Sequence, residues 1–234
     1  MTVSILASTQ IEYPDEDGLP MAESDFQRDY LMAAVKLLEI HFQNRPDVYV
    51  SGNLFIYYEE GNPQSVVAPD TFVVIGVEKC QRRSYKTWEN GDKTPDFVLE
   101  ITSMSTRSQD QGAKKGIYAF LGVREYFQYD PTGDYLDPQL QGLHLVEGNY
   151  FPMPQTSLPD GTSSVSSEVL GLDLRVLPDG KLRFYNPTTG EFLLTHEETE
   201  QARREAEAAR QEAQERAQRL AAKLQELGID PDAL

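Results

Sequence analysis

Residues 95–131 read PDFVLEITSMSTRSQDQGAKKGIYAFLGVREYFQYDP, and this stretch decides the fold. It begins with a short apolar run at 95–102, continues with a helical pattern at 108–123 and ends with an aromatic run at 124–131. A strand, a helix and a second strand in about 35 residues is the length of one βαβ unit. Because such a crossover is nearly always right-handed and makes its strands parallel, we expect two parallel strands bridged by a helix.

The first strand of this unit carries a carboxylate. Side chains alternate between the two faces of a strand, so Val98, Glu100 and Thr102 share one face. A glutamate in a mostly apolar strand is costly to bury unless it is paired or bound to a metal. A second carboxylate, Asp70, precedes the apolar run at 71–77, and lysines follow on the helix. Two carboxylates and a lysine can hold one Mg²⁺ and steer a water molecule onto a phosphate.

Three motifs resemble a known family. They are PDFVLEITSMST at 95–106, Asp110-x-x-x-Lys114-x-x-x-Tyr118, and GVREYFQYDP at 122–131. With Asp70 about thirty residues before Glu100, they resemble the bacterial Uma-two family of restriction-endonuclease-like proteins, within the PD-(D/E)XK nuclease superfamily. The resemblance covers roughly residues 20–195.

The resemblance implies a fold and an activity. The fold is an α/β (α+β) restriction-endonuclease-like core, in the order helix, three strands, helix, strand, with a mixed sheet. The activity is a metal-dependent endonuclease that hydrolyses DNA phosphodiester bonds, with Mg²⁺, or Mn²⁺, as cofactor. Asp70 and Glu100 would be the metal ligands, with the main-chain carbonyl of Ile101 as a third. Lys114 would orient or deprotonate the attacking water and offset charge on the phosphate.

Each of these residues also has a simpler interpretation. Asp70 follows a proline and could be a turn residue, which is a common role for Asp. Glu100 could be an edge-strand glutamate that faces water. Lys114 could form a surface pair with Asp110, four residues earlier on the same helix. The neighbouring Lys115 lies about 100° around the helix from Lys114, so the apolar face favours Lys114 as the catalytic lysine.

The sequence departs from the superfamily pattern at one position. In the Glu-x-Lys pattern the lysine follows the glutamate by two residues, and here that position is Thr102. The resemblance implies that the lysine comes from the following helix instead. A further superfamily acid on the first helix is either Glu23 or Glu39. The alternative function is a catalytically inactive nuclease-like scaffold that acts in protein–protein interaction.

Charge argues against a nucleic-acid enzyme for the chain as a whole, because the formal net charge is −17. Residues 70–127 are the exception, with 9 basic and 8 acidic side chains. The basic run at 79–86 could track a phosphate backbone or could simply be a solvated loop. One cysteine, no signal peptide and no membrane-spanning apolar run predict a cytoplasmic protein with no membrane partner.

The pattern predicts three regions. Residues 1–22 form an acidic, extended lead-in, and residues 23–195 form the nuclease-like domain. This domain begins with a helix to about residue 44, has a polar loop at 78–94, and ends in a β extension of short alternating strands after residue 131. Residues 196–234 form a C-terminal helical region.

The composition of the C-terminal region, rich in Ala, Glu, Gln and Arg, predicts one long helix at about 197–227. An apolar stripe runs along it at spacings of three and four residues. We therefore expect a coiled coil or a docked helix, and a possible homo-oligomer through it. The simpler interpretation is a lone solvated helix, since alanine side chains bury little surface. The stripe consists of Ala202, Ala206, Ala209, Ala213, Ala217, Leu220, Leu224 and Leu227.

Overall fold

The computed structural model describes residues 11–14, 25–103, 106, 108 and 112–226. The chain divides into two compact units, residues 1–193 and residues 194–234. The predicted lead-in at 1–22 lies outside the described residues except at 11–14, so its extended conformation stays a prediction.

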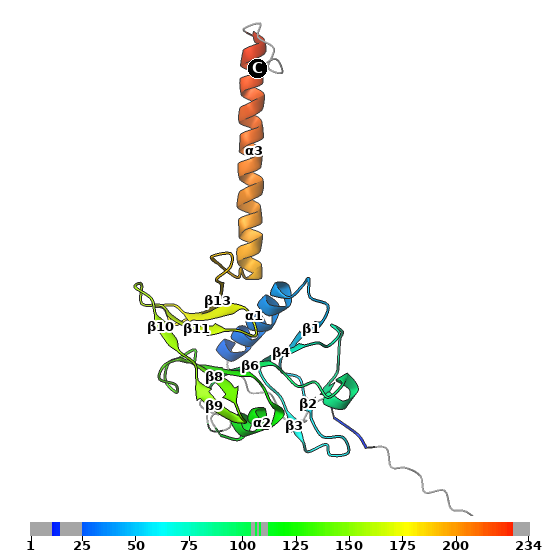
Figure 1. Cartoon of the computed structure of the whole chain (residues 1–234). Coiled ribbons are helices and arrows are strands. Elements are labelled where there is room, and N and C mark those ends of the chain that lie inside the picture. The colour runs from blue at the N-terminus through cyan, green and yellow to red at the C-terminus, as the bar shows by residue number, and fades with distance from the viewer. Residues whose placement is uncertain (1–10, 15–24, 104–105, 107, 109–111, 227–234) are drawn as a thin grey trace, which may run out of the picture. The chain divides into compact units, whose positions relative to one another are not determined.

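A six-stranded sheet forms the centre of the first unit (Figure 1). Only β6 and β7 are parallel, and every other pair in this sheet is antiparallel. The helix α2 (Lys114–Leu121) connects these two strands, so the predicted βαβ unit is confirmed. In sheet order the strands are β1 (Val48–Ser51), β4 (Thr71–Ile75), β6 (Phe97–Ile101), β7 (Glu125–Tyr129), β8 (Leu140–Val146) and β9 (Asn149–Pro152).

The helices α1 (Asp25–His41) and α2 lie on opposite faces of this sheet (Figure 1). With β1, β4, β6 and β7 they give the order helix, three strands, helix, strand, which confirms the expected mixed α+β core. Alternation along β6 sorts its side chains between two apolar clusters. Phe97, Leu99 and Ile101 pack on the α1 side, whereas Val98 packs with Tyr118 on the α2 side.

A second, three-stranded sheet is built from segments that lie between β1 and β6 along the chain. Its order is β3 (Val66–Val67), β2 (Ile56–Tyr57) and β5 (Tyr85–Lys86). The chain therefore leaves the main sheet after β1 and enters this one at β2. Gly52 lies between them, where a Cβ would come 2.1 Å from the main-chain oxygen of Asp70 and 2.7 Å from Val35 Cγ2. Only glycine fits so close an approach of two backbone segments.

The prediction of a polar loop at 78–94 was wrong in part. This segment contains β5 and the 3₁₀ helix η1 (Thr87–Asn90). Tyr85 is fully buried against Tyr49 and Phe72, and its hydroxyl donates to the carbonyl of Lys93. One buried aromatic side chain among polar neighbours organises the segment, and periodicity cannot detect so short a strand.

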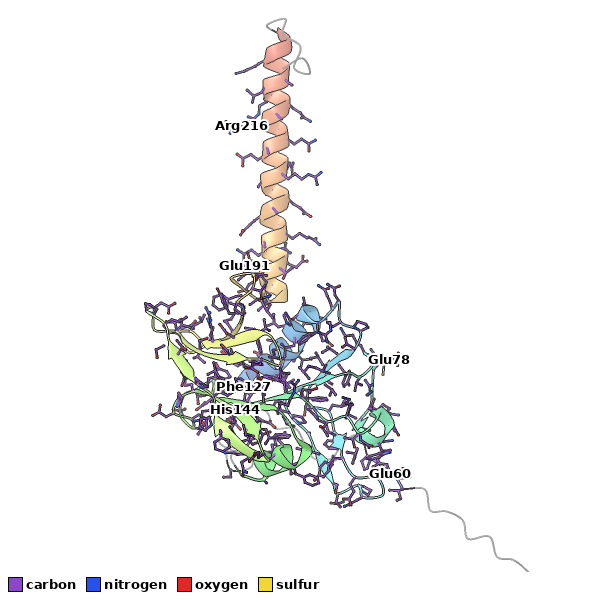
Figure 2. The ribbon with its side chains drawn as sticks, viewed as in Figure 1. Glu60, Glu78, Phe127, His144, Glu191 and Arg216 are labelled. Atoms are coloured by element: carbon purple, nitrogen blue, oxygen red, sulfur yellow. The ribbon has the colours of Figure 1, made fainter. Side chains whose placement is uncertain are left out.

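The predicted β extension after residue 131 is divided in the structure: its first strands, β8 and β9, belong to the main sheet, and the remaining strands form an antiparallel five-stranded sheet that shares the core on the α1 side. Phe127 of β7 lies in the interior of the unit (Figure 2) and belongs to that shared core. Two of the sheet's turns contain Gly180 and Gly190 at positive φ, as the Pro-Asp-Gly and Thr-Thr-Gly sequences predict. The strands are β10 (Gln155–Ser157), β11 (Ser163–Ser167), β12 (Leu172–Val176), β13 (Leu182–Asn186) and β14 (Glu191–Phe192).

The second unit contains one long helix, α3 (His196–Glu226), as predicted. A capping box begins it: the Glu198 amide donates to Thr195 Oγ1, and the Thr195 amide donates to Glu198 Oε2. Side chains project from α3 on all sides (Figure 2), and Leu220 is 56% exposed. Leu227, at the predicted end of the stripe, lies outside the described residues. Among the helices described, none combines the length and apolar composition that a bilayer crossing requires.

Candidate functional site

Glu100 is the centre of the candidate site. It lies on β6, inside the six-stranded sheet, and no part of it is exposed to solvent. Both carboxylate oxygens accept hydrogen bonds from α2. Tyr118 Oη donates to Oε1 at 2.5 Å, and Lys114 Nζ donates to Oε2 at 3.0 Å. The interpretation of Glu100 as an edge-strand glutamate facing water is therefore wrong.

Asp70 lies beside Glu100 because of strand register. Thr71, the first residue of β4, is opposite Leu99 of the antiparallel strand β6. Continuing this register by one residue places Asp70 opposite Glu100 on the same face. The Asp70 amide lies 3.4 Å from Glu100 Oε2, and Asp70 Oδ2 accepts a hydrogen bond from the Ile101 amide at 2.6 Å. Asp70 and Glu100 thus lie on neighbouring strands on the same face of the sheet, with the Asp70 backbone amide at the Glu100 carboxylate.

Lys114 provides a positive charge at the same place. Its side chain is 17% exposed, and its amine forms an ion pair with the buried Glu100 carboxylate. Lys115 is half-buried, and no carboxylate lies in ion-pair range of its amine within the described residues. Asp110 lies outside those residues, so the Asp110–Lys114 surface pair stays a prediction.

Tyr118 is a partner of Glu100 that the sequence did not indicate. The motif with Lys114 contained it, but its position on the helix indicated only packing. Burial, reinforced by the negative charge of Glu100 beside it, holds the pKa of the Tyr118 hydroxyl well above its usual value of 10.0. The phenol therefore stays protonated and acts as a permanent donor to Glu100 Oε1.

A second buried polar pair lies next to Tyr118. The Tyr118 and Tyr126 rings are 5.1 Å apart, and Gln128 donates to the Tyr126 hydroxyl at 3.0 Å. Gln128 pairs with Glu100 in the register of β6 and β7. The face of the sheet around Glu100 is therefore polar in an otherwise aromatic and aliphatic setting.

The other acidic candidates do not join this group in the described residues. Glu39 pairs with Lys36 at 3.3 Å, on the surface of α1. Glu23 lies outside the described residues. The alternative between them is not decided.

The basic run at 79–86 is largely engaged in local contacts. Lys79 donates to the carbonyl of Phe42, and Lys86 forms an ion pair with Glu89. The Arg82 guanidinium lies 4.3 Å from the centre of the Tyr49 ring. These contacts hold Lys79, Arg82 and Lys86 against the protein and disfavour a phosphate-tracking surface.

The donor set suits a hard divalent cation. Asp70 and Glu100 supply carboxylate oxygens at one place, and Mg²⁺, Mn²⁺ and Ca²⁺ prefer oxygen ligands. No cluster of three or more His, Cys, Asp or Glu side chains with metal-binding geometry occurs in the described part of the chain. Asp70 and Glu100 are thus the two carboxylates available here, and the Ile101 carbonyl as third ligand stays a prediction.

The chain is similar to a family of known sequences and to a solved structure. The model of the Uma2 family, described as "Putative restriction endonuclease", matches residues 5–177. A crystal structure from Anabaena variabilis, described as a "putative nuclease belonging to DUF820", is 12% identical to this chain. The matched region covers 63% of this chain and 75% of the Anabaena variabilis chain, and the TM-score is 0.45. No curated protein matches the sequence.

Proposed function

The chain belongs to the Uma2 family of restriction-endonuclease-like proteins, and we propose that it is a metal-dependent endonuclease that hydrolyses DNA phosphodiester bonds. The observation that carries the proposal is that the Asp70 amide and the Lys114 amine both lie at Oε2 of the buried Glu100 carboxylate. Two carboxylates and a lysine around one point form a recurring arrangement for ion-assisted phosphate hydrolysis.

Asp70, Glu100 and the carbonyl of Ile101 would hold Mg²⁺, or Mn²⁺ in its place. When bound, the ion supplies a Lewis acid that polarises the scissile phosphate and lowers the pKa of water. The Tyr118 hydroxyl holds Oε1 of Glu100, so Oε2 is the oxygen that lies toward Asp70 and Lys114. This fixed orientation spares the carboxylate a rearrangement when it binds a cation.

Lys114 would act on the phosphate and the attacking water. Its amine lies at the Glu100 carboxylate, so a phosphate held there would lie within reach of the same amine. A lysine in this position offsets negative charge in the transition state and orients, or takes a proton from, the incoming water. Glu-x-Lys enzymes have their lysine at the position of Thr102. Threonine carries no charge, so it cannot supply this group here.

The proposal is tested by incubating the protein with a mixture of supercoiled, linear and single-stranded DNA, with RNA as a separate arm. Reactions contain Mg²⁺, Mn²⁺ or a chelator, and Glu100→Ala is treated in parallel. We expect cleavage of DNA by the wild type only with the divalent ion. Cleavage of RNA but not of DNA would show that the substrate is RNA and not the DNA proposed here. If the wild type does not raise its melting temperature in Mg²⁺ or Mn²⁺ and cleaves nothing, the inactive scaffold is the better account.

We also propose that the protein self-associates through α3 in a reducing, cytoplasmic setting, which suits its single cysteine. The support is the Ala and Leu stripe on a helix whose described side chains are mostly exposed. A chain that ends at Thr195 should have a lower oligomeric mass than the full chain in light scattering. A monomeric full-length protein would contradict this part of the proposal.

A further inference from the structure

Thr102 has a buried hydroxyl that the proposed function leaves unused. The residue is 1% exposed, and its Oγ1 has no hydrogen-bond partner among the described residues. A buried hydroxyl without a partner costs free energy, whereas valine would fill the same space without that cost. The hydroxyl is therefore available to a partner outside the described residues, such as an ordered water molecule.

The position of Thr102 connects this hydroxyl to the candidate site. Thr102 follows Glu100 by two residues, so both side chains lie on the α2 face of the sheet. The Thr102 amide donates to the carbonyl of Tyr129 at 2.8 Å, which extends the β6–β7 pairing beyond Ile101 and fixes the backbone there. The hydroxyl is thus held directly after the end of β6, two residues beyond Glu100 on the same face.

Resting on the proposed function, we infer that Thr102 is a positioning residue for the water around the divalent ion. Its Oγ1 hydrogen-bonds an ordered water molecule beside Glu100 and so orients the hydration of the ion. A hydroxyl can both donate to and accept from such a water. The two tasks of the lysine in Glu-x-Lys enzymes are then divided in this chain: Lys114 supplies the charge, and Thr102 supplies a directed hydrogen bond.

The chain offers a matched control at Thr71. This residue is also fully buried, and its Oγ1 also has no hydrogen-bond partner in the part of the chain that the structure describes. Thr71 is opposite Leu99 in the register, so its side chain lies on the α1 face, away from Glu100. Thr71→Val and Thr102→Val therefore make the same chemical change on opposite faces of the sheet.

The test measures Mn²⁺ binding by calorimetric titration and by the rise in melting temperature, without DNA. The variants are Thr102→Val, Thr102→Ser, Thr71→Val and Glu100→Ala, each compared with the wild type. We expect Thr102→Val to weaken Mn²⁺ binding by about 10-fold or more, as outer-shell substitutions do. Thr102→Ser should retain most of the affinity, and Thr71→Val should bind as the wild type does. Without metal, Thr102→Val should melt at or above the wild-type temperature.

The outcomes separate this inference from the proposed function. If Glu100→Ala loses Mn²⁺ binding but Thr102→Val binds normally, the ion site stands and the role of Thr102 is overturned. Equal weakening by Thr71→Val and Thr102→Val would also overturn it, since the effect would then come from packing. Absence of Mn²⁺ binding by the wild type would overturn both. If Thr102→Val does not fold, Thr102→Ser against Thr102→Ala decides the same question.

Discussion

Two buried glutamates on neighbouring strands have opposite surroundings. Glu100 of β6 faces α2, where it meets a lysine amine and a tyrosine hydroxyl. Glu125 of β7 is opposite Phe97 in the register and lies on the α1 side. It accepts hydrogen bonds from the Ser167 hydroxyl and from the amides of Glu168 and Val169. Both carboxyl groups are buried, yet of these two, within the described residues, only Glu100 forms an ion pair, and only Glu100 has an aspartate, Asp70, opposite it in the continued register.

The difference shows that burial of a carboxylate does not by itself identify an active site. Glu125 fastens the five-stranded sheet to the main sheet through a turn more than forty residues away, and three fixed donors satisfy it. The donors of Glu100 include Lys114, a side chain that can move, and Glu100 lies beside Asp70. A cation can therefore compete for the Glu100 carboxylate. The Glu125 carboxylate is already satisfied by its three donors and serves to join the two sheets.

The largest expected effect comes from removing the cation beside Glu100. Lys114→Ala should lower the rate of DNA cleavage by about 10²–10⁴-fold, the usual cost of losing an acid–base or charge-stabilising group. Mn²⁺ binding should persist, since the carboxylates remain. Lys115→Ala is the matched control and should retain most activity in the same gel assay. Loss of activity in Lys115→Ala with an active Lys114→Ala would reverse the assignment.

The next comparison removes one hydroxyl donor from each glutamate. Tyr118→Phe keeps the ring and frees Oε1 of Glu100, so we expect Mn²⁺ affinity to fall by about 10-fold or more. Ser167→Ala should leave Mn²⁺ affinity unchanged and should lower the free energy of unfolding by about 1–3 kcal/mol, because Glu125 loses a buried partner. Calorimetric titration and urea unfolding measure the two quantities. A change in Mn²⁺ affinity for Ser167→Ala would show that the two sites are coupled.

Much of the arrangement around Glu100 could be predicted from the sequence, because the patterns that indicate it lie within one short segment of the chain. Alternation along 97–102 and helical spacing at 114–121 place Glu100 and Lys114 toward each other. The tyrosine donor could not be predicted, since a buried tyrosine at that spacing packs equally well without a partner.

Features that depend on distant segments could not be predicted either. The partners of Glu125 are more than forty residues away in sequence, and its strand reads only as an aromatic run. Likewise, Gly52 in the sequence suggests a turn or bulge, but the close approach to Asp70 that separates β1 from β2 is a tertiary contact.

The smallest expected effect is a difference in pH dependence. Burial raises the pKa of Glu125 above its usual 4.5, against the lowering effect of its hydrogen bonds from Ser167, Val169 and Glu168. The folded chain therefore holds the Glu125 proton more tightly than the unfolded chain does. As the pH rises from about 4.5 through the raised pKa, the wild type should lose stability relative to Glu125→Gln. Urea unfolding of both proteins across this range measures the difference, and parallel curves would contradict it.

The most direct test of the central claim is to compare Glu100→Gln with Glu125→Gln in one DNA cleavage assay with Mg²⁺ or Mn²⁺. Both changes replace a buried carboxyl by its neutral isostere, on adjacent strands of one sheet. The account predicts that Glu100→Gln remains folded and loses ion-dependent cleavage, while Glu125→Gln cleaves at a rate close to that of the wild type. Undiminished cleavage by Glu100→Gln would contradict the claim that this carboxylate is the centre of the active site.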